Sequence, residues 1–336
     1  MARLELDVAV ETLRLAQPFR ISGYVFTASD VVVVTLRDGD HAGRGEGGGV
    51  YYLGDDVAHM LQSIGIARTA IEAGPTREEL RSIMPPGGAR NAVDCALWEL
   101  EAARAGVPVW QLAGVSDPKP LRTTFTLGAD SPEAMAEGAR RYADARSIKV
   151  KLTGELELDI DRVKAVRAAR PDVWLGVDGN QGFAIEELGQ LVAVLEDQNV
   201  ALLEQPLARG READLDGYKS SVPIAGDESL LTLADVAGAV GRFDVVNIKL
   251  DKCGGLTEGL LMAAEARRLG LDVMVGNMVG SSLAMAPAFV LGQGCDIVDL
   301  DGPTFLAEDR APSVVYEAGT IMAGPEVWGS SRVAVA

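Results

Sequence analysis

The feature that most constrains the fold is an alternation of short apolar segments with amphipathic ones, which begins near residue 121. Eight segments have the length and composition of buried strands, at residues 122–127, 147–152, 173–178, 200–204, 222–227, 244–249, 272–277 and 296–301. The strands that end at residues 178, 204, 227 and 249 are 26, 23 and 22 residues apart, the size of a strand–helix unit in a TIM-type barrel. We therefore predict a barrel of eight parallel strands, with an open doubly wound sheet as the structural alternative.

The N-terminal part of the chain has a different pattern. A β-branched run at residues 31–36 is followed by Asp38-Gly39, a hairpin turn signal, and by a glycine-rich stretch at 42–49. Apolar residues at helical spacing then fill the segments 58–73, 77–84 and 89–105. Strands followed by helices indicate a segregated α+β domain ahead of the barrel.

Charge and histidine content exclude several classes of function. The 336 residues include 49 acidic and 31 basic side chains, a net charge of −18, so we expect neither nucleic acid nor an anionic membrane as a partner. The two histidines, His41 and His59, lie in the first fifth of the chain. The predicted barrel therefore has no histidine for a Ser-His-Asp triad, a Cys-His pair or a zinc site.

Cysteine usage and hydropathy predict where the protein works. Cys95, Cys253 and Cys295 are far apart and odd in number, as expected of thiols in a reducing compartment. The N-terminus has the pattern of a strand and not of a signal peptide. The longest apolar region, 269–292, is interrupted by polar residues and proline. We expect a cytoplasmic protein without a membrane span.

Ionisable residues close most of the predicted strands. In a TIM-type barrel the C-terminal strand ends form the mouth where chemistry occurs. A single charge at such a position is more often a solvated loop residue or half of an ion pair. Asp178, Glu204 and Asp227, however, end three adjacent strands, so their carboxylates should converge on one side of the mouth. Three hard oxygen ligands without histidine or thiolate favour Mg²⁺ over zinc.

Lysines end two strands that face each other. Lys151 closes the second strand and Lys249 the sixth, and these are opposite in a ring of eight. Lys149 points to the same side as Lys151 because side chains alternate along a strand. Two lysines beside a divalent cation are suited to removing a proton from one face of a carbon acid and returning it to the other. The cation and the Lys149 ammonium would lower the pKa of Lys151, as a base at neutral pH requires.

These motifs resemble the enolase superfamily, in its muconate lactonizing enzyme subgroup. The resemblance runs to about residue 310 and rests on Lys149-Val150-Lys151, Asp178-Gly179-Asn180, Glu204-Gln205-Pro206, Asp227-Glu228-Ser229 and Lys249. It implies a (β/α)7β barrel at 119–311 that holds one Mg²⁺ per subunit, under an α+β capping domain formed by residues 1–118 and the C-terminal segment 312–336. Gly43-Arg44-Gly45-Glu46 is similar to the sequence before the family's mobile capping loop, where flexible glycines suit a lid.

Within the subgroup, Asp299-Leu300-Asp301-Gly302-Pro303 resembles the dipeptide epimerases, such as those that act on L-Ala-D/L-Glu. The resemblance implies that the two aspartates bind the α-ammonium of a dipeptide. Members that act on Ala-Glu carry an arginine in the first capping loop, where this chain has 23–26 without one, which predicts an apolar side-chain preference. The expected substrate-binding residues are Asp299, Asp301, Tyr24, Phe26, Tyr51, Asn277 and Met278.

Our leading hypothesis is a Mg²⁺-dependent dipeptide epimerase, an isomerase that moves a proton at the α-carbon of the C-terminal residue through a metal-stabilised enediolate. Lys151 and Lys249 would be the acid/base residues, and Lys149 would stabilise the substrate carboxylate. Other activities of the superfamily stay open, namely N-acylamino acid racemase, o-succinylbenzoate synthase and cycloisomerase. A noncatalytic ligand-binding barrel is the remote alternative. We expect a homo-oligomer.

Overall fold

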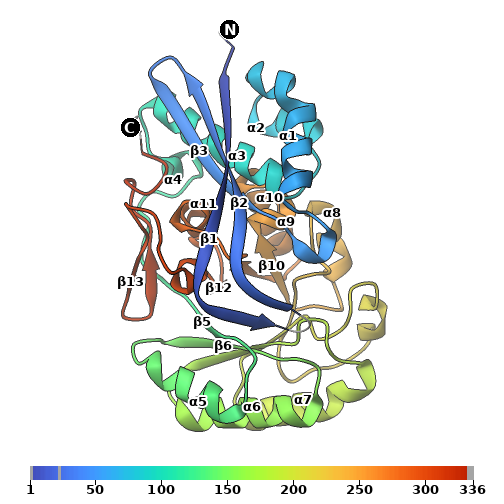
Figure 1. The fold of residues 1–336 in the computed structure, drawn as a ribbon. Coiled ribbons are helices and arrows are strands. Elements are labelled where there is room, and N and C mark those ends of the chain that lie inside the picture. The colour runs from blue at the N-terminus through green and yellow to red at the C-terminus, as the bar shows by residue number, and fades with distance from the viewer. Residues whose placement is uncertain (1–2, 22–23, 331–336) are drawn as a thin grey trace.

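The computed structural model describes residues 3–21 and 24–330, and its lower part in Figure 1 is a barrel. Eight strands pair in parallel, each with its neighbour in the sequence: β5 (Phe125–Leu127), β6 (Ser147–Lys151), β7 (Trp174–Asp178), β8 (Leu202–Glu204), β9 (Ile224–Gly226), β10 (Val245–Lys249), β11 (Asp272–Gly276) and β12 (Ile297–Val298). The first and last strands meet where the Thr124 N–H donates to Val298 O at 3.0 Å. The predicted barrel is confirmed, and the open sheet is excluded.

Helices surround the strands. The connections between strands contain α5 (Pro132–Arg141), α6 (Leu156–Ala169), α7 (Ile185–Asp197), α8 (Leu233–Val236), α9 (Leu250–Cys253), α10 (Leu256–Arg268) and α11 (Ser282–Gly292), with the 3-10 helices η2 (Glu212–Leu215) and η3 (Ala237–Ala239). α5 begins where Ser131 Oγ accepts the Ala134 N–H at 3.2 Å and Pro132 fills the first helical position. Apolar side chains of neighbouring strands, among them Leu202 of β8, Val245 of β10 and Met274 of β11, pack together in a separate buried cluster.

The predicted first strand is wrong in one respect. Residues 122–127 form two strands, because β4 (Leu121–Arg122) leaves the barrel and pairs with β14 (Thr320–Met322). β14 also pairs with β13 (Val315–Glu317) to make a small antiparallel sheet. The last predicted strand, 296–301, is shorter than expected, since β12 ends at Val298 and the chain then enters the mouth.

The upper part is an antiparallel meander covered by helices. β1 (Glu5–Ile21), β2 (Tyr24–Asp38) and β3 (His41–Gly48) pair in order. They are followed by η1 (Tyr51–Leu53), α1 (Val57–Glu72), α2 (Arg77–Ile83), α3 (Gly88–Ala105) and α4 (Val109–Leu112). This part has its own hydrophobic core, and the hairpin of β1 and β2 reaches down to the barrel mouth (Figure 1). The predicted α+β unit is confirmed.

The glycines of β3 serve close packing and not a flexible lid. A Cβ atom at Gly43, Gly45 or Gly47 would come within 2.0–2.1 Å of a backbone carbonyl oxygen of α3. These alternate positions share one face of the strand, which lies directly against the helix. The expectation that glycines at 43 and 45 give a lid its mobility is therefore wrong, because their role is to remove side chains from a strand–helix contact.

The C-terminal segment reaches the upper part of the molecule. The Trp328 Nε1–H donates to Arg44 O at 2.9 Å, and the Gly329 N–H donates to Glu99 Oε1 at 2.9 Å. A second set of contacts joins the two parts near the mouth. Asp251, after β10, accepts the Gly48 N–H at 2.9 Å and an N–H of Asn91 at 2.8 Å. The position of the upper part over the mouth is thus fixed by buried hydrogen bonds.

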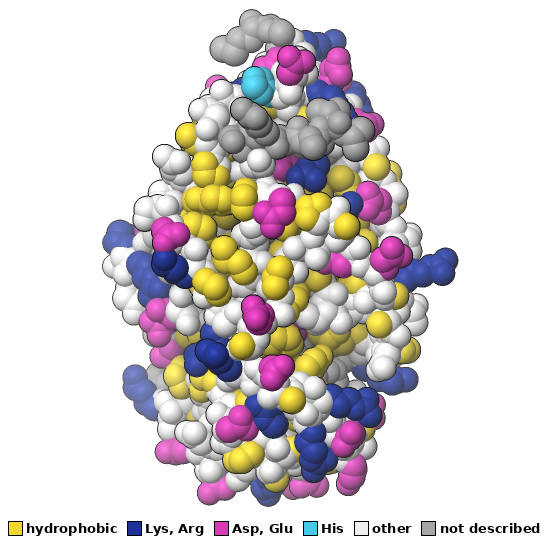
Figure 2. Space-filling model, turned by 90° about the vertical axis from the view of Figure 1, so that its left-hand side faces the viewer, with side chains coloured by type: hydrophobic (Ala, Val, Ile, Leu, Met, Phe, Trp, Pro, Cys, Tyr) yellow, Lys and Arg dark blue, Asp and Glu magenta, His cyan; other side chains and the backbone are white. Residues whose placement is uncertain are grey.

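The surface carries mixed charges. Figure 2 shows the side that bears β13, where apolar side chains gather above a lower half rich in charged ones. Val315 of β13 is 55% exposed. Among the helices of the described residues, we find none with the length and apolar character needed to cross a membrane.

Candidate active site

The register of the parallel strands places the predicted residues side by side. Lys151 is the pairing partner of Asp178, and Asp178 is the partner of Glu204. All of these side chains extend from C-terminal strand ends into the mouth, as the sequence predicts. Asp227 follows β9 directly, and Lys249 ends β10. The strand ends therefore form an arc in which three acids lie between two lysines.

Lys149 lies at the centre of this arc. Its Nζ is 3.1 Å from Asp178 Oδ2, 2.7 Å from Glu204 Oε2 and 2.8 Å from Asp299 Oδ2. The side chain is buried. Burial alone would lower the pKa of Lys149, but the three carboxylates outweigh it and hold the pKa well above its usual value. Lys149 is thus a permanent ammonium.

The two proposed acid/base lysines each have one carboxylate partner. Lys151 Nζ is 2.7 Å from Asp178 Oδ2, and Lys249 Nζ is 2.6 Å from Asp227 Oδ2. Burial would lower the pKa of Lys249, but Asp227 and Glu204 raise it overall. Both lysines line one cavity beneath the upper part of the molecule. The prediction that they approach a common space from different strands fits this geometry.

The chemistry of the three acids fits a hard divalent cation. Asp178, Glu204 and Asp227 are almost completely buried, and burial together with Asp178 raises the pKa of Glu204 to about 8. Glu204 Oε2 accepts no hydrogen bond of normal geometry, and Lys149 is its nearest cation. Within the described ranges, no group of three acidic, histidine or cysteine side chains is arranged to hold a metal ion as it stands. Binding of Mg²⁺ would require the ion to take the place of lysine contacts on these oxygens.

The two aspartates after β12 differ in their surroundings, which the sequence does not predict. Asp299 is paired with Lys149 and accepts a short hydrogen bond from the Thr124 hydroxyl. Asp301 Oδ2 accepts the Thr126 N–H at 2.6 Å. Burial, followed by the nearby charge of Asp299, raises the pKa of Asp301 to about 7. Asp301 is therefore the acid that lacks a cation, while Asp299 already holds one.

Most predicted substrate-binding residues line the cavity. Phe26, Tyr51, Asn277 and Met278 lie on its wall together with the three lysines and both aspartates. Asn277 also donates from Nδ2 to Asp299 O at 2.6 Å. The side chain of Tyr24 lies outside the part of the molecule that the structure describes.

Tyr51 connects two of the aromatic residues of this wall. Its ring meets Phe26 with centroids 5.5 Å apart and Tyr52 with centroids 5.2 Å apart. Burial raises the pKa of Tyr51, so the phenol stays neutral. The upper part of the molecule thus contributes a cluster of aromatic rings to the lining of the cavity.

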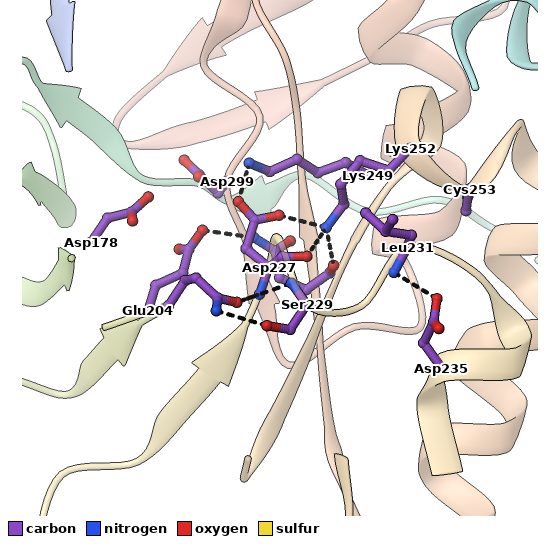
Figure 3. Close-up of polar contacts among 12 residues, drawn as sticks. Asp178, Glu204, Asp227, Ser229, Leu231, Asp235, Lys249, Lys252, Cys253 and Asp299 are labelled. Atoms are coloured by element: carbon purple, nitrogen blue, oxygen red, sulfur yellow. Dashed lines mark hydrogen bonds and ion pairs between the residues drawn. The ribbon is translucent and has the colours of Figure 1, made fainter. Parts of the chain in front are cut away.

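Lys252 is a residue of the site that sequence reasoning missed. Its Nζ donates to Asp227 O at 2.6 Å and to Asn247 O at 3.1 Å, and it forms an ion pair with Asp227 Oδ1. Figure 3 shows Lys249 and Lys252 on the same carboxylate. The side chain is fully buried and does not line the cavity, so it holds Asp227 from behind. Its position three residues after Lys249 is the one signal that the sequence offers.

Glu228 was also missed. It lines the cavity next to Asp227, its Oε2 is buried without a hydrogen-bond partner, and burial followed by Asp227 raises its pKa to about 7. Alternation along a strand would turn two consecutive residues to opposite sides. β9 ends at Gly226, so the rule does not apply to Asp227 and Glu228. The mouth therefore holds a fourth acid near the three predicted ones.

Two family models match the chain. Residues 3–114 match the mandelate racemase / muconate lactonizing enzyme N-terminal domain, and residues 134–320 match a model described as enolase C-terminal domain-like. The sequence is 39% identical over 318 residues to the L-Ala-D/L-Glu epimerase of Escherichia coli (strain K12), covering 94% of this chain and 98% of that protein. It is 40% identical to the N-acetyl-D-glutamate racemase of Pseudoalteromonas sp, covering 86% of this chain and 91% of that protein.

A solved structure shows the same architecture. The dipeptide epimerase from Enterococcus faecalis V583, complexed with Mg and the dipeptide L-Leu-L-Tyr, aligns with a TM-score of 0.90 at 27% identity, over 98% of each chain. The similarity therefore extends over both the barrel and the domain above it.

Proposed function

We propose that this chain, which belongs to the mandelate racemase / muconate lactonizing enzyme family of the enolase superfamily, is a Mg²⁺-dependent dipeptide epimerase. Like its relatives, it is an isomerase of the racemase and epimerase type that acts on amino acid derivatives. The observation that carries the proposal is one cavity lined by Lys151 and Lys249 from facing strands and by Asp301 at another edge. An acid at that edge suits a substrate that carries an ammonium group.

The lysines perform the proton transfer in this proposal. One of them, as a neutral amine, takes the α-proton of the C-terminal residue, and the electron pair of the broken C–H bond passes into the adjacent carboxylate. The other lysine, as an ammonium, delivers a proton to the opposite face of the same carbon. Lys149, which lines the cavity as an ammonium, would stabilise the carboxylate of the substrate.

The three acids would hold the cation. Mg²⁺, one per subunit, would be bound by Asp178, Glu204 and Asp227 and would neutralise the negative charge that develops on the substrate carboxylate. Lys252 pairs with Oδ1 of Asp227 and would hold this carboxylate in place, while the contact of Oδ2 with Lys249 is the one that the ion would replace.

An apolar side chain on the C-terminal residue fits the cavity best. Phe26, Tyr51 and Tyr52 line the cavity together with Lys249. The cationic groups on the described cavity wall are three lysines, each already paired with an acid. A glutamate side chain would therefore be buried against rings without a free counter-ion, which is unfavourable.

N-acylamino acid racemisation is the second candidate, because of the 40% identity to the N-acetyl-D-glutamate racemase. The same two lysines would serve it. Asp301 argues against this substrate class, since a neutral acyl amide gives its carboxylate no cation to bind. The two candidates thus differ in the group that meets Asp301.

Deuterium exchange decides between them. The enzyme with Mg²⁺ is incubated in D₂O with a set of L,L-dipeptides and with N-acetyl amino acids, and label at Cα is followed by NMR. We expect exchange at the C-terminal residue of dipeptides with apolar side chains. Exchange of N-acetyl amino acids without exchange of any dipeptide would contradict the proposal.

The setting of the enzyme is a further part of this proposal. We place it in the cytoplasm, with support from three free and mostly buried thiols whose pKa values are raised by burial. We also propose a homo-oligomer, for which exposed apolar side chains such as Val315 provide contact area. Light scattering of the purified protein tests the second point.

A further inference from the structure

The end of the cavity at Asp301 is separated from a second, outer groove by a thin wall. The groove lies between the end of β1, the segment after β5 and α5. Phe19, Thr126 and Phe305 line both spaces. Asp301 and Asp299 line the inner cavity and do not line the groove. These three residues therefore mark the boundary between the two spaces.

The aromatic part of this wall is a contact pair. The rings of Phe19 and Phe305 have centroids 4.7 Å apart, tilted by 48°. Rings at this distance touch, so neither a backbone nor a side chain passes between them. We call Phe19 and Phe305 the aromatic wall.

Both rings are held by backbone contacts. A β-bridge joins Leu15, in the strand of Phe19, to Leu306, the residue after Phe305. The Ala307 N–H also donates to Arg14 O at 2.8 Å. Phe305 is thus next to a backbone link with β1, and Phe19, four residues after Leu15, is paired with Phe26 of β2. Backbone pairing therefore holds the chain segments that carry the two rings.

The aromatic wall is attached to the acid that lacks a cation. Phe305 ends η4 (Gly302–Phe305), which starts directly after Asp301. The Thr304 N–H donates to Asp301 O at 2.9 Å, and the Thr126 N–H holds the Asp301 carboxylate. In a dipeptide, the N-terminal side chain is bonded to the same carbon as the ammonium. A substrate with its ammonium at Asp301 therefore places that side chain beside the aromatic wall.

We propose that the aromatic wall formed by Phe19 and Phe305 selects the N-terminal residue of the dipeptide by size, admitting small and medium apolar side chains. This inference rests on the proposed function. Larger side chains are excluded because the rings close the way to the outer groove. Removal of either ring joins the two spaces and gives a large side chain room beyond the wall.

The experiment measures the ratio of the activities with two substrates, which a general loss of folded enzyme leaves unchanged. The kcat/KM for Cα exchange is measured with L-Ala-L-Leu and L-Trp-L-Leu for the wild type, Phe305→Ala and Phe19→Ala. We expect the ratio of the value for L-Trp-L-Leu to that for L-Ala-L-Leu to rise at least tenfold in each variant. Phe305→Leu, which retains part of the volume, should give a smaller rise.

Tyr51→Ala is the control away from the aromatic wall. It removes an aromatic ring that lies near Lys249 and Glu228, so it should change the preference among C-terminal residues and leave the N-terminal ratio as in the wild type. A similar rise in the N-terminal ratio for Tyr51→Ala would overturn the inference, because any loosening of the cavity would then suffice.

The outcomes also separate this inference from the proposed function. If the wild type exchanges L-Ala-L-Leu and the ratio stays unchanged in Phe305→Ala, Phe305→Leu and Phe19→Ala, the aromatic wall does not select and the function stands. If the wild type exchanges no dipeptide, the proposed function fails and the inference fails with it.

Discussion

The barrel and the domain above it meet in one cavity, and they contribute to it in opposite ways. The barrel supplies buried lysines and carboxylates that are paired with one another, such as Lys149 with Asp178, Glu204 and Asp299. The upper domain supplies aromatic rings, such as Phe26 and Tyr51. Removal of one partner of a buried ion pair strongly destabilises a protein, whereas an apolar surface tolerates substitution by apolar residues of similar volume. We therefore expect the paired charges of the barrel to tolerate little change, while the rings around the cavity can vary with the substrate.

Removal of an acid/base lysine should have the largest effect. We expect Lys151→Ala and Lys249→Ala each to reduce Cα exchange from one configuration of the C-terminal residue by about 10²–10⁴-fold and to leave exchange from the other configuration measurable. NMR of L,L- and L,D-dipeptides in D₂O gives both rates. Lys164→Ala, on the exposed side of α6, is the control. Equal loss for both configurations in each variant would refute the two-sided arrangement.

The next largest effect should be the loss of stability on removal of the buried ammonium group of Lys252. Lys252→Met leaves Asp227 without one of its two cations in a fully buried site. We expect the free energy of unfolding to fall by about 3–5 kcal/mol, measured by urea denaturation. Lys164→Met should change it by less than about 0.5 kcal/mol. A small effect at Lys252 would show that the barrel tolerates unpaired charge and would weaken the contrast between the two regions.

A smaller effect should come from Asp251, a buried acid between the barrel and the upper domain, and it concerns the pH dependence of stability. Burial raises the pKa of Asp251 to about 7, with further contributions from Glu46 and Asp55. This pKa is above the value of about 3.9 in an unfolded chain. The contribution of the protonated Asp251 to stability is therefore fully present below pH 4 and is lost as the pH rises to about 7.

Asp251→Asn should remove this dependence. The free energy of unfolding of the variant, relative to that of the wild type, should therefore be ~2–4 kcal/mol higher at pH 8 than at pH 4. Denaturation of both proteins across this range provides the measurement, and Asp161→Asn, at an exposed position of α6, should follow the wild type. Parallel profiles for wild type and Asp251→Asn would count against a buried acid at this junction.

The smallest effect should come from Tyr51, an aromatic residue of the upper domain that lies near Lys249. Tyr51→Ala removes a ring that packs on Phe26 and Tyr52. We expect the kcat/KM for L-Ala-L-Tyr to fall about tenfold relative to that for L-Ala-L-Ala, while exchange itself persists. Steady-state exchange rates with both dipeptides test this, with Leu61→Ala of α1 as the control. Loss of exchange with both substrates would mean that the upper domain also carries the chemistry.

The strand-end residues could be predicted because two simple rules decide their positions. Lys149 and Lys151 share a face through the alternation of a strand, and Asp178 and Glu204 meet through parallel register. The same rules did not reveal Glu228 and Lys252, since both lie beyond a strand end where the period of two no longer applies.

Other features depend on contacts that no local pattern encodes. The period of β3 identifies a strand but does not tell that α3 lies on the face of Gly43, Gly45 and Gly47. Likewise, the spacing of Asp299 and Asp301 predicts a common direction, yet Asp299 pairs with a lysine from β6 and Asp301 with the backbone of β5. Long-range packing decides which of two similar acids is available to a ligand.

The contact between β3 and α3 has a consequence for how such an enzyme can acquire new substrates. Each of the glycines 43, 45 and 47 faces a carbonyl oxygen that excludes every other amino acid, so a mutational search gains nothing there. Phe26, Tyr51 and Phe305 lie away from this contact and line the cavity. A library of variants at these aromatic positions, with the three glycines kept, could therefore be tested for activity on new dipeptides while the packing of β3 on α3 is retained.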